Sequence, residues 1–440
     1  MKKRMLSVLL AMSMLFGMTA CKKGTEEKAA EDTDPKVKIS FLSRYANPEN
    51  RRDQYYLGKL EEFKESHPNV EIEDLSVVEG DSYISKMKTL IASGNVPDLF
   101  ICSYEMPRLE MAENHTIADL EPLIESESWT GPADKKWFEG YSFEADGVEG
   151  IYGIPNALGT AQIFVNKKIF EDLKLEIPKT WEDLEKQIPV FQNAGIIPCE
   201  ISAKATPKCS LLFTMLAVKM YGPEIQQQFK NKTVDWTSPE MMAVLDKYKE
   251  LIDSGVFGSD AVSYSFDNCI NDFKDGKTAM LIEYSFMFTT IQDAEIAQDV
   301  TCINLLGFED QPEYWDLWYT DTFEGFCIGS KPDTPEYEAA VDLLTLLLSQ
   351  DTFNGCAEVM GGGAYPLDVD WDRSNAIPFM LDFEEAYAGC DNITAILPAY
   401  LGEAALSDLT ASEVQTLFVG RSPEEVAKTL DAEYKKILQK

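Results

Sequence analysis

The densest group of side chains that could bind a ligand lies between residues 315 and 323, in a stretch without clear periodicity. It contains Trp315, Trp318, Tyr319, Asp321 and Phe323. Aromatic faces beside a carboxylate suit a ligand with apolar C–H faces and hydroxyl edges, as a sugar ring has. Loop packing would explain the same residues, because most aromatic side chains belong to a core. We therefore expect this stretch to divide between ligand contact and core.

Further polar and aromatic residues come directly after short segments that we predict to be strands. These segments are residues 37–41, 99–102 and 280–282. The groups that follow them are Ser43, Arg44 and Tyr45; Ser103, Tyr104 and Glu105; and Glu283, Tyr284 and Phe286. In an open α/β sheet, ligands bind outside the carboxyl ends of the strands. All nine residues are therefore candidate ligand contacts.

The elements that must position these residues alternate between strand and helix patterns. Residues 37–41 and 70–72 alternate at a period of two, whereas Tyr56, Leu60 and Phe63 recur at helical spacing between them. A second helical pattern with Ile84, Met87 and Ile91 precedes the apolar segment at 99–102. Such alternation predicts an α/β fold with a mostly parallel sheet.

Later segments carry helix start and stop signals. Thr180 and Ser422 precede helical patterns as N-caps, and Ser238 precedes a third that Gly255 closes. Trp181 and Trp236 lie beside such signals, so we interpret both as structural. The chain shows no internal repeat.

Several classes of chemistry have no signature in the chain. It contains only two histidines, His67 and His115, and no Cys-x-x-Cys pair, so we predict neither a metal site nor another cofactor. No G-x-S-x-G motif is present, and the glycines at 361–363 lack the Lys-Ser or Lys-Thr of a phosphate loop. We predict a protein that is not an enzyme. An exported glycoside hydrolase or lyase stays open as an alternative, because carboxylates are abundant.

The net charge is −36 at pH 7, and no basic cluster offsets it. Such a field repels polyanions, which excludes nucleic acid as a partner. A cationic ligand such as a polyamine would suit acidic and aromatic groups, and this alternative also stays open.

The N-terminus has the pattern of an exported lipoprotein. Residues 1–20 combine Lys2, Lys3 and Arg4 with a short apolar stretch and read as a signal peptide. Residues 18–21 resemble the bacterial lipobox, in which Cys21 would be lipidated, with Met18 where Leu, Ile or Val is usual. Residues 21–35 are polar and suit a flexible tether. We expect the protein to be lipid-anchored at the extracellular face of the bacterial membrane.

The chain contains nine cysteines, one of which is Cys21. Most of the others lie in apolar sequence, where a thiol commonly serves as a small buried hydrophobe. A bridge between Cys199 and Cys209 is left open.

Four ordered stretches together resemble the extracellular solute-binding proteins of family 1, the maltose-binding-protein-like group. They are residues 83–99, residues 152–184, residues 273–280 and residues 325–366. Each stretch is weak alone, but the set spans nearly the whole chain in the expected order.

The resemblance implies the two-lobe periplasmic-binding-protein fold of type II, with a ligand cleft between lobes joined by hinge strands. On that pattern the first lobe takes residues 36–121 and 305–355, and the second takes residues 122–304 and 356–440. Family positions also suggest Asn156 and Thr160 as polar ligand contacts. The implied function is capture of a carbohydrate, an oligosaccharide above all, by a monomer that delivers it to the permease subunits of an ABC transporter.

Overall fold

The computed structural model describes residues 36–78, 81–103, 106–322, 324–390, 392–393 and 404–438. The predicted signal peptide, Cys21 and the tether lie outside these ranges, as do Tyr104, Glu105 and Phe323. Within the described ranges, no helix is both long and apolar enough to cross a membrane.

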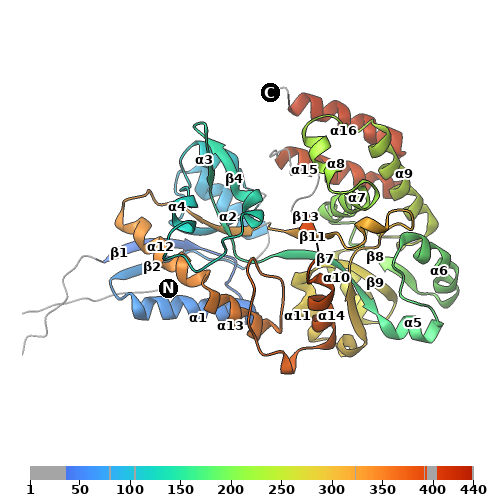
Figure 1. The fold of residues 1–440 in the computed structure, drawn as a ribbon, viewed down its shortest axis with the longest axis horizontal. Helices are drawn as coiled ribbons and strands as arrows, with labels where there is room; N and C mark the ends of the chain where they lie inside the picture. Colours follow the sequence, from blue (N-terminus) through green and yellow to red (C-terminus); the bar gives the residue numbers. More distant parts are fainter. Residues whose placement is uncertain are drawn as a thin grey trace, which may run out of the picture. The chain divides into compact units, whose positions relative to one another are not determined.

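One sheet defines the first lobe. Its strands are β1 (Val37–Leu42), β2 (Val70–Asp74), β3 (Leu99–Ser103), β6 (Ile154–Pro155) and β12 (Glu324–Ile328), in the order β2-β1-β3-β12-β6. Strand β1 runs parallel to β2 and β3, whereas β12 runs antiparallel to β3 and β6. The helices are α1 (Arg51–Ser66), α2 (Asp81–Ala92), α3 (Arg108–Glu113), α4 (Glu121–Ile124), α12 (Pro335–Leu347) and α13 (Gln350–Met360). Helices α1, α12 and α13 pack together along one face of the sheet (Figure 1). A hairpin of β4 (Ser142–Ala145) and β5 (Val148–Ile151) completes the lobe.

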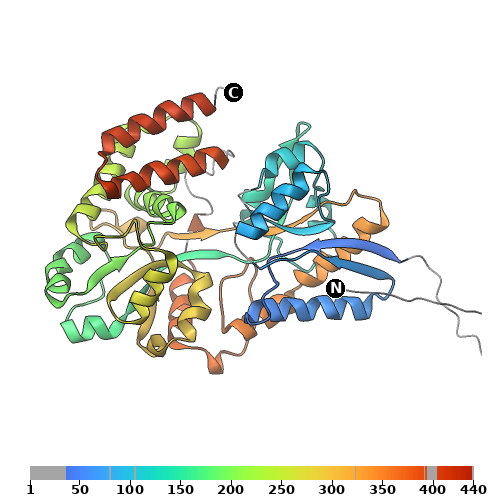
Figure 2. The same cartoon turned by 180° about the vertical axis from the view of Figure 1, so that it is seen from behind.

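A second sheet defines the second lobe. Its strands are β7 (Gly159–Asn166), β8 (Ile197–Glu200), β9 (Thr278–Tyr284), β10 (Val300–Ile303), β11 (Trp318–Asp321) and β13 (Asn392–Ile393). The first helices are α5 (Lys167–Leu173), α6 (Trp181–Ala194), α7 (Thr206–Tyr221), α8 (Glu224–Lys230) and α9 (Pro239–Ser254). Helices α10 (Phe266–Lys274), α11 (Phe288–Gln292), α14 (Pro378–Tyr387), α15 (Ala404–Gln415) and α16 (Pro423–Ile437) follow. Helix α15, red in Figure 2, packs on both α7 and α16.

Both faces of the second sheet are covered, which explains why all eight residues of β7 are buried. Ala161, Ile163 and Val165 face one apolar core with α6, α7 and α9. Phe164 faces another core with α10, α11 and α14. The polar residues Thr160 and Gln162 of β7 are buried as well, and the Thr160 hydroxyl donates a hydrogen bond to Gln162 Oε1.

The predicted helix signals are confirmed in three places. The Thr180 hydroxyl accepts a hydrogen bond from Asp183 N at 3.1 Å and so caps α6. Ser422 and Glu425 form a reciprocal capping box at the start of α16. Gly255 ends α9 with a φ of 83°, a left-handed conformation that glycine adopts without steric cost. Trp181 and Trp236 are fully buried, as predicted for structural residues.

The described chain passes between the two lobes three times, near residues 156–158, 322 and 361–377. These crossings differ from the predicted boundaries. Residues 138–155 pack in the core of the first lobe, and β6 pairs with β12 in its sheet. Residues 305–321 pack in the second lobe instead of the first. The pairing of strands sets the boundaries of the two lobes, and the family resemblance did not predict this pairing.

All eight cysteines among the described residues are free, and seven of them are buried. Cys199 and Cys209 are both buried thiols, so the bridge left open by the sequence is not formed.

Candidate functional site

The residues after β1 lie at the carboxyl end of the first sheet and are buried. Ser43 Oγ lies 2.9 Å from Ser76 Oγ. The guanidinium of Arg44 lies 4.9 Å from the centre of the Tyr83 ring, and its Nε lies 3.7 Å from Glu324 Oε2. Ser103, at the end of β3, is buried and faces Glu324 across the β3–β12 ladder. The strand ends therefore bring these predicted residues together.

Tyr45 and Asn156 connect the first lobe to the first crossing. Asn156 Nδ2 donates a hydrogen bond to the Tyr45 hydroxyl. The Tyr45 ring stacks on Tyr56, with centroids 4.2 Å apart, and is 2% exposed. The Tyr45 ring is thus buried by packing and has no exposed face. Asn156 Oδ1 is buried without a hydrogen-bond partner, which leaves one acceptor at this crossing.

Glu283 lies at the carboxyl end of β9 and is fully buried in an ion pair with Lys208, near the start of α7. Ser202 Oγ donates to Glu283 Oε1 at 3.3 Å, and Tyr284 N donates to Oε2 at 3.2 Å. Burial lowers the pKa of Lys208, while the Glu283 carboxylate opposes that shift. Both Glu283 oxygens already have partners within the protein.

Two aromatic rings follow Glu283 and share this buried cation. Lys208 Nζ lies over the Tyr284 ring at 4.2 Å and over the Phe286 ring at 5.3 Å. The two rings are stacked, with centroids 5.8 Å apart and an interplanar angle of 21°. Phe286 is 45% exposed, the one aromatic ring among the exposed large hydrophobic residues that the structure describes. The pair offers an apolar surface at the end of β9.

The described residues of the cluster at 315–323 divide between the core and the end of β11. Trp318 is fully buried, with edge contacts to Phe383 and Tyr387, and it presents no face to solvent. Trp315 packs on Gly307 and donates its ring N–H to Phe308 O at 2.7 Å, which anchors a loop. Neither ring lies beside Tyr284 and Phe286 in the described contacts.

Asp321 ends β11 and lies at the second crossing. Its Oδ2 accepts a hydrogen bond from the Tyr319 hydroxyl at 2.7 Å. Burial raises the pKa of Asp321 to about 6, although Tyr319 and the positive charge of Arg108 oppose the shift. Thr160, opposite Thr320 in the sheet, is buried and donates to Gln162 Oε1 at 3.0 Å. The Tyr319 ring in turn contacts the Tyr284 ring.

Sequence reasoning missed Lys208, Arg108 and Phe266. Lys208 lies in α7, where residues 208–219 are buried, and a lysine in such an apolar stretch is the signal that could have found it. The Arg108 guanidinium lies 4.7 Å from the centre of the Tyr141 ring. Its positive charge also opposes the rise in the pKa of Asp321, which belongs to the second lobe. Phe266, at the start of α10, contacts Phe286.

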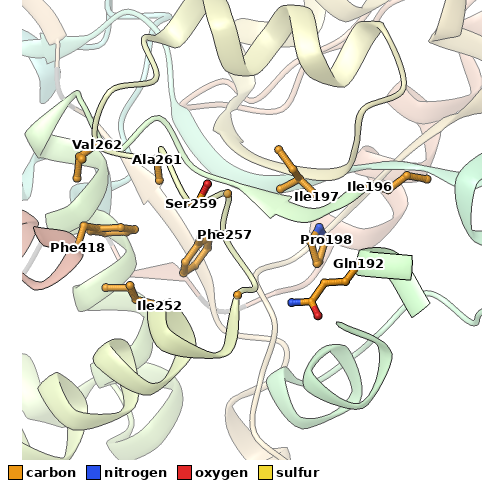
Figure 3. Close-up of a pocket in the computed structure, with 12 residues that line it drawn as sticks. Gln192, Ile196, Ile197, Pro198, Ile252, Phe257, Ser259, Ala261, Val262 and Phe418 are labelled. Carbon is orange, nitrogen blue, oxygen red and sulfur yellow. The ribbon is translucent and has the colours of Figure 1, made fainter. Parts of the chain in front are cut away.

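A separate cavity of about 360 Å³ lies between α6, α9 and the residues before β8 (Figure 3). Gln192 and Ser259 are polar members of a mainly apolar wall that also includes Phe257 and Phe418. Ile196 and Ile197 also line the cavity and place it at the start of β8, whereas Glu283 and Tyr284 end the adjacent parallel strand β9. The cavity is therefore distinct from the candidate site. No cluster of metal-ligating side chains occurs in the parts of the chain that the structure describes.

Two α/β sheets joined by three crossings, with buried polar groups where the strands end, define a two-lobe binding protein. The chain belongs to the bacterial extracellular solute-binding protein family, whose sequence profile matches residues 47–349. This confirms the family resemblance and the fold class predicted from the sequence.

Individual relatives are distant but extend over nearly the whole chain. YcjN of Escherichia coli strain K12, named as an ABC transporter periplasmic-binding protein, is 21% identical over 98% of this chain and 97% of its own length. The solved structure of a chitin oligosaccharide binding protein superposes with a TM-score of 0.76 at 19% identity, covering 92% of this chain and 99% of that one. A structure from work on xylan utilization by Caldanaerobius polysaccharolyticus gives a TM-score of 0.76 at 18% identity, covering 90% of this chain and all of the other.

Proposed function

We propose that this protein is the lipid-anchored substrate-binding subunit of an ABC importer, which captures an oligosaccharide between its lobes and delivers it to the permease. The family supports a binding role outside the cytoplasm and an ABC transporter as the partner. The names of two structural relatives mention chitin oligosaccharide and xylan, which favours a carbohydrate ligand here. We expect the protein to act as a monomer.

The observation that carries this proposal is charge compensation beside an exposed aromatic surface. Glu283 is paired with Lys208, and Glu324 with Arg44. Asp321 accepts a hydrogen bond from Tyr319, and burial favours its neutral form. A polyamine would need carboxylates free to pair with its ammonium groups. A neutral ligand with C–H faces fits the exposed ring of Phe286 better.

A thermal-shift screen tests the ligand class, because a ligand that binds only the folded state raises the melting temperature. The panel contains chito-, xylo-, cello- and malto-oligosaccharides, their monosaccharides, and spermidine. We expect a shift with at least one oligosaccharide series and none with spermidine. A shift with spermidine that salt abolishes, without a response to any sugar, would contradict the proposal.

The enzyme alternative makes a different prediction for the same ligands. Overnight incubation of the protein with the sugar that binds best should return that sugar unchanged in chromatography. Shorter products that disappear when a single carboxylate is replaced would instead identify a glycoside hydrolase or lyase.

Anchoring is tested at Cys21. Replacing Cys21 by Ala should move the protein from the membrane fraction to the medium, because a diacylated cysteine holds a protein stably at the membrane. Replacing Met18 by Leu, a residue usual in lipoboxes, provides the matched control and should leave the protein at the membrane. Membrane retention of the Cys21→Ala protein would refute the anchor without affecting the ligand assignment.

Ligand capture should also change the relation between the lobes. A ligand that contacts both lobes favours the arrangement in which both contacts form. Small-angle scattering should therefore give a smaller radius of gyration with the bound oligosaccharide than without it.

A further inference from the structure

The separate cavity at the start of β8 has an aromatic and aliphatic wall (Figure 3). Phe257 and Phe418 line it, and their ring centroids lie 5.9 Å apart at an interplanar angle of 52°. Ile197 and Ile252 add aliphatic surface. The volume of about 360 Å³ lies in the range of pockets that hold small ligands. The wall therefore suits the apolar body of a small molecule.

Two helices end at this cavity. Gln192 lies in the last turn of α6 and Ile252 in the last turn of α9, and both residues line the cavity. Gly195 and Gly255 cap the two helices, each in a left-handed conformation. The carbonyl end of a helix carries a partial negative charge. The two helix ends therefore make the electrostatic potential in the cavity more negative.

A buried carboxylate lies behind the same wall. Gly258 lines the cavity, and a Cβ atom placed on it would lie 3.8 Å from Glu200 Oε1. Glu200 is 3% exposed, and the Thr278 hydroxyl donates a hydrogen bond to its other oxygen, Oε2, at 2.9 Å. Because residue 258 is glycine, no side chain of that residue screens the carboxylate from the cavity.

Positive side chains do not offset this charge at the wall. Among the described residues that line the cavity there is no lysine, arginine or histidine. Lys277 acts on Glu200, but its ammonium is already paired with Asp272 at 2.8 Å and with Asp275 at 3.0 Å. Burial raises the pKa of Glu200 to about 7, although the Thr278 hydrogen bond and Lys277 oppose the rise. A positively charged ligand would favour the ionised carboxylate and would be attracted by it.

We propose that this cavity binds a small organic cation, with its apolar body against Phe257 and Phe418 and its ammonium group toward Glu200 and the two helix ends. Aromatic faces attract cations as well. Spermidine does not meet this description, because its charges are spread along the whole molecule and it has no apolar body. The cavity is distinct from the candidate site, so binding here does not depend on the proposed carbohydrate function.

Three probes of similar shape separate the effect of charge from that of the apolar body. They are phenethylamine, the neutral phenethyl alcohol and the anion 3-phenylpropionate. Ligand-detected NMR titration at about pH 8, where an alkyl ammonium stays charged, measures their dissociation constants. We expect phenethylamine to bind with a dissociation constant of about 1 mM or lower, the scale for a ligand of this size. The alcohol should bind about tenfold more weakly, and the anion more weakly still.

Two substitutions test where the cation binds. Glu200→Gln keeps the shape of the side chain but removes its charge, so the affinity for the amine should fall about fivefold while that for the alcohol stays unchanged. Ser259→Trp places a large side chain on an exposed residue that lines the cavity, and it should abolish binding of both probes. Asp246→Asn removes an exposed carboxylate elsewhere on α9 and, as the matched control, should leave every affinity unchanged.

Equal binding of the amine and the anion would overturn the proposal, as would an unchanged ratio of amine to alcohol affinity in Glu200→Gln. Amine binding that survives Ser259→Trp would place the cation elsewhere and overturn it too. A wild-type protein that does not bind phenethylamine would have the same consequence. Melting temperatures check that each variant is folded. None of these results bears on sugar binding, so a failure here leaves the proposed function standing.

Discussion

Two buried lysines near opposite ends of α7 have different surroundings. Lys208, 7% exposed, is paired with the Glu283 carboxylate beneath the rings of Tyr284 and Phe286. Lys219, 1% exposed, donates to Trp315 O at 2.7 Å. No carboxylate lies within ion-pair distance of Lys219 in the described chain, and Asp316 acts on it only at longer range. Burial lowers the pKa of both. The Glu283 carboxylate thus opposes the effect of burial on Lys208, whereas burial lowers the pKa of Lys219 to about 7 beside a backbone carbonyl.

The largest expected effect comes from removing the partner of Lys208. Glu283→Gln preserves the shape of the side chain but leaves the ammonium without a counter-charge. We expect a loss of about 3–5 kcal/mol in the free energy of unfolding, the cost of breaking a buried ion pair. Urea denaturation measures it. The double variant Lys208→Met/Glu283→Leu should recover part of this loss, and a single variant as stable as wild type would show that the pair carries no net energy.

Lys219 should make the free energy of unfolding depend on pH. Burial lowers its pKa to about 7, from an ordinary value of 10.5 in the unfolded chain. Between these values the unfolded chain binds the extra proton, so stability should rise with pH, by roughly 5 kcal/mol in all. Below pH 7 both states are protonated and this rise is absent.

The variant Lys219→Met should lack this part of the pH dependence. The difference between its unfolding free energy and that of wild type, measured from pH 7 to 10, isolates the lysine. A constant difference across that range would contradict the assignment of a neutral lysine.

The rings above Lys208 should affect ligand binding more than stability. Phe286→Ala removes an exposed ring, and we expect a loss of about 1–3 kcal/mol in sugar affinity, the scale for burying a large apolar side chain. Isothermal titration checks this value. The matched change Phe418→Ala, in the wall of the separate cavity, should leave affinity unchanged. If the Phe286→Ala protein binds the sugar as tightly as wild type does, the sugar site lies elsewhere in the molecule.

The smallest expected effect concerns salt. Because Lys208 and Arg44 are compensated within the protein, a neutral ligand should bind with affinity that changes less than about threefold as ionic strength rises. A steep loss with salt would indicate that charges of the site pair with the ligand.

Periodicity and caps predicted the elements better than they predicted lobe membership. The alternation in residues 37–41 and the cap at Thr180 both correspond to observed elements. The lobe boundaries depended on which strands pair. Strand β11 joins β7, whereas β12 joins β3 a few residues later, and no local pattern distinguishes the two.

The candidate site was predicted by position at strand ends, but its chemistry was not. Glu283 was expected to face the ligand, and the structure pairs it with Lys208, a residue distant in sequence. Trp318 is a residue type that could bind a sugar, but its position in β11 puts the ring in the core. Partners from distant segments decide these roles, so composition alone could not separate Trp318 from Phe286. All the predicted ligand contacts, Tyr104 and Glu105 included, stay predictions.

The position of β12 in the first sheet has a consequence for the order in which the chain folds. This strand, residues 324–328, lies between β3 and β6 and is hydrogen-bonded to both. The first sheet therefore cannot be completed until the whole second-lobe segment between β6 and β12 is part of the chain. Such long-range pairing slows folding, because a large loop must close before its contacts form.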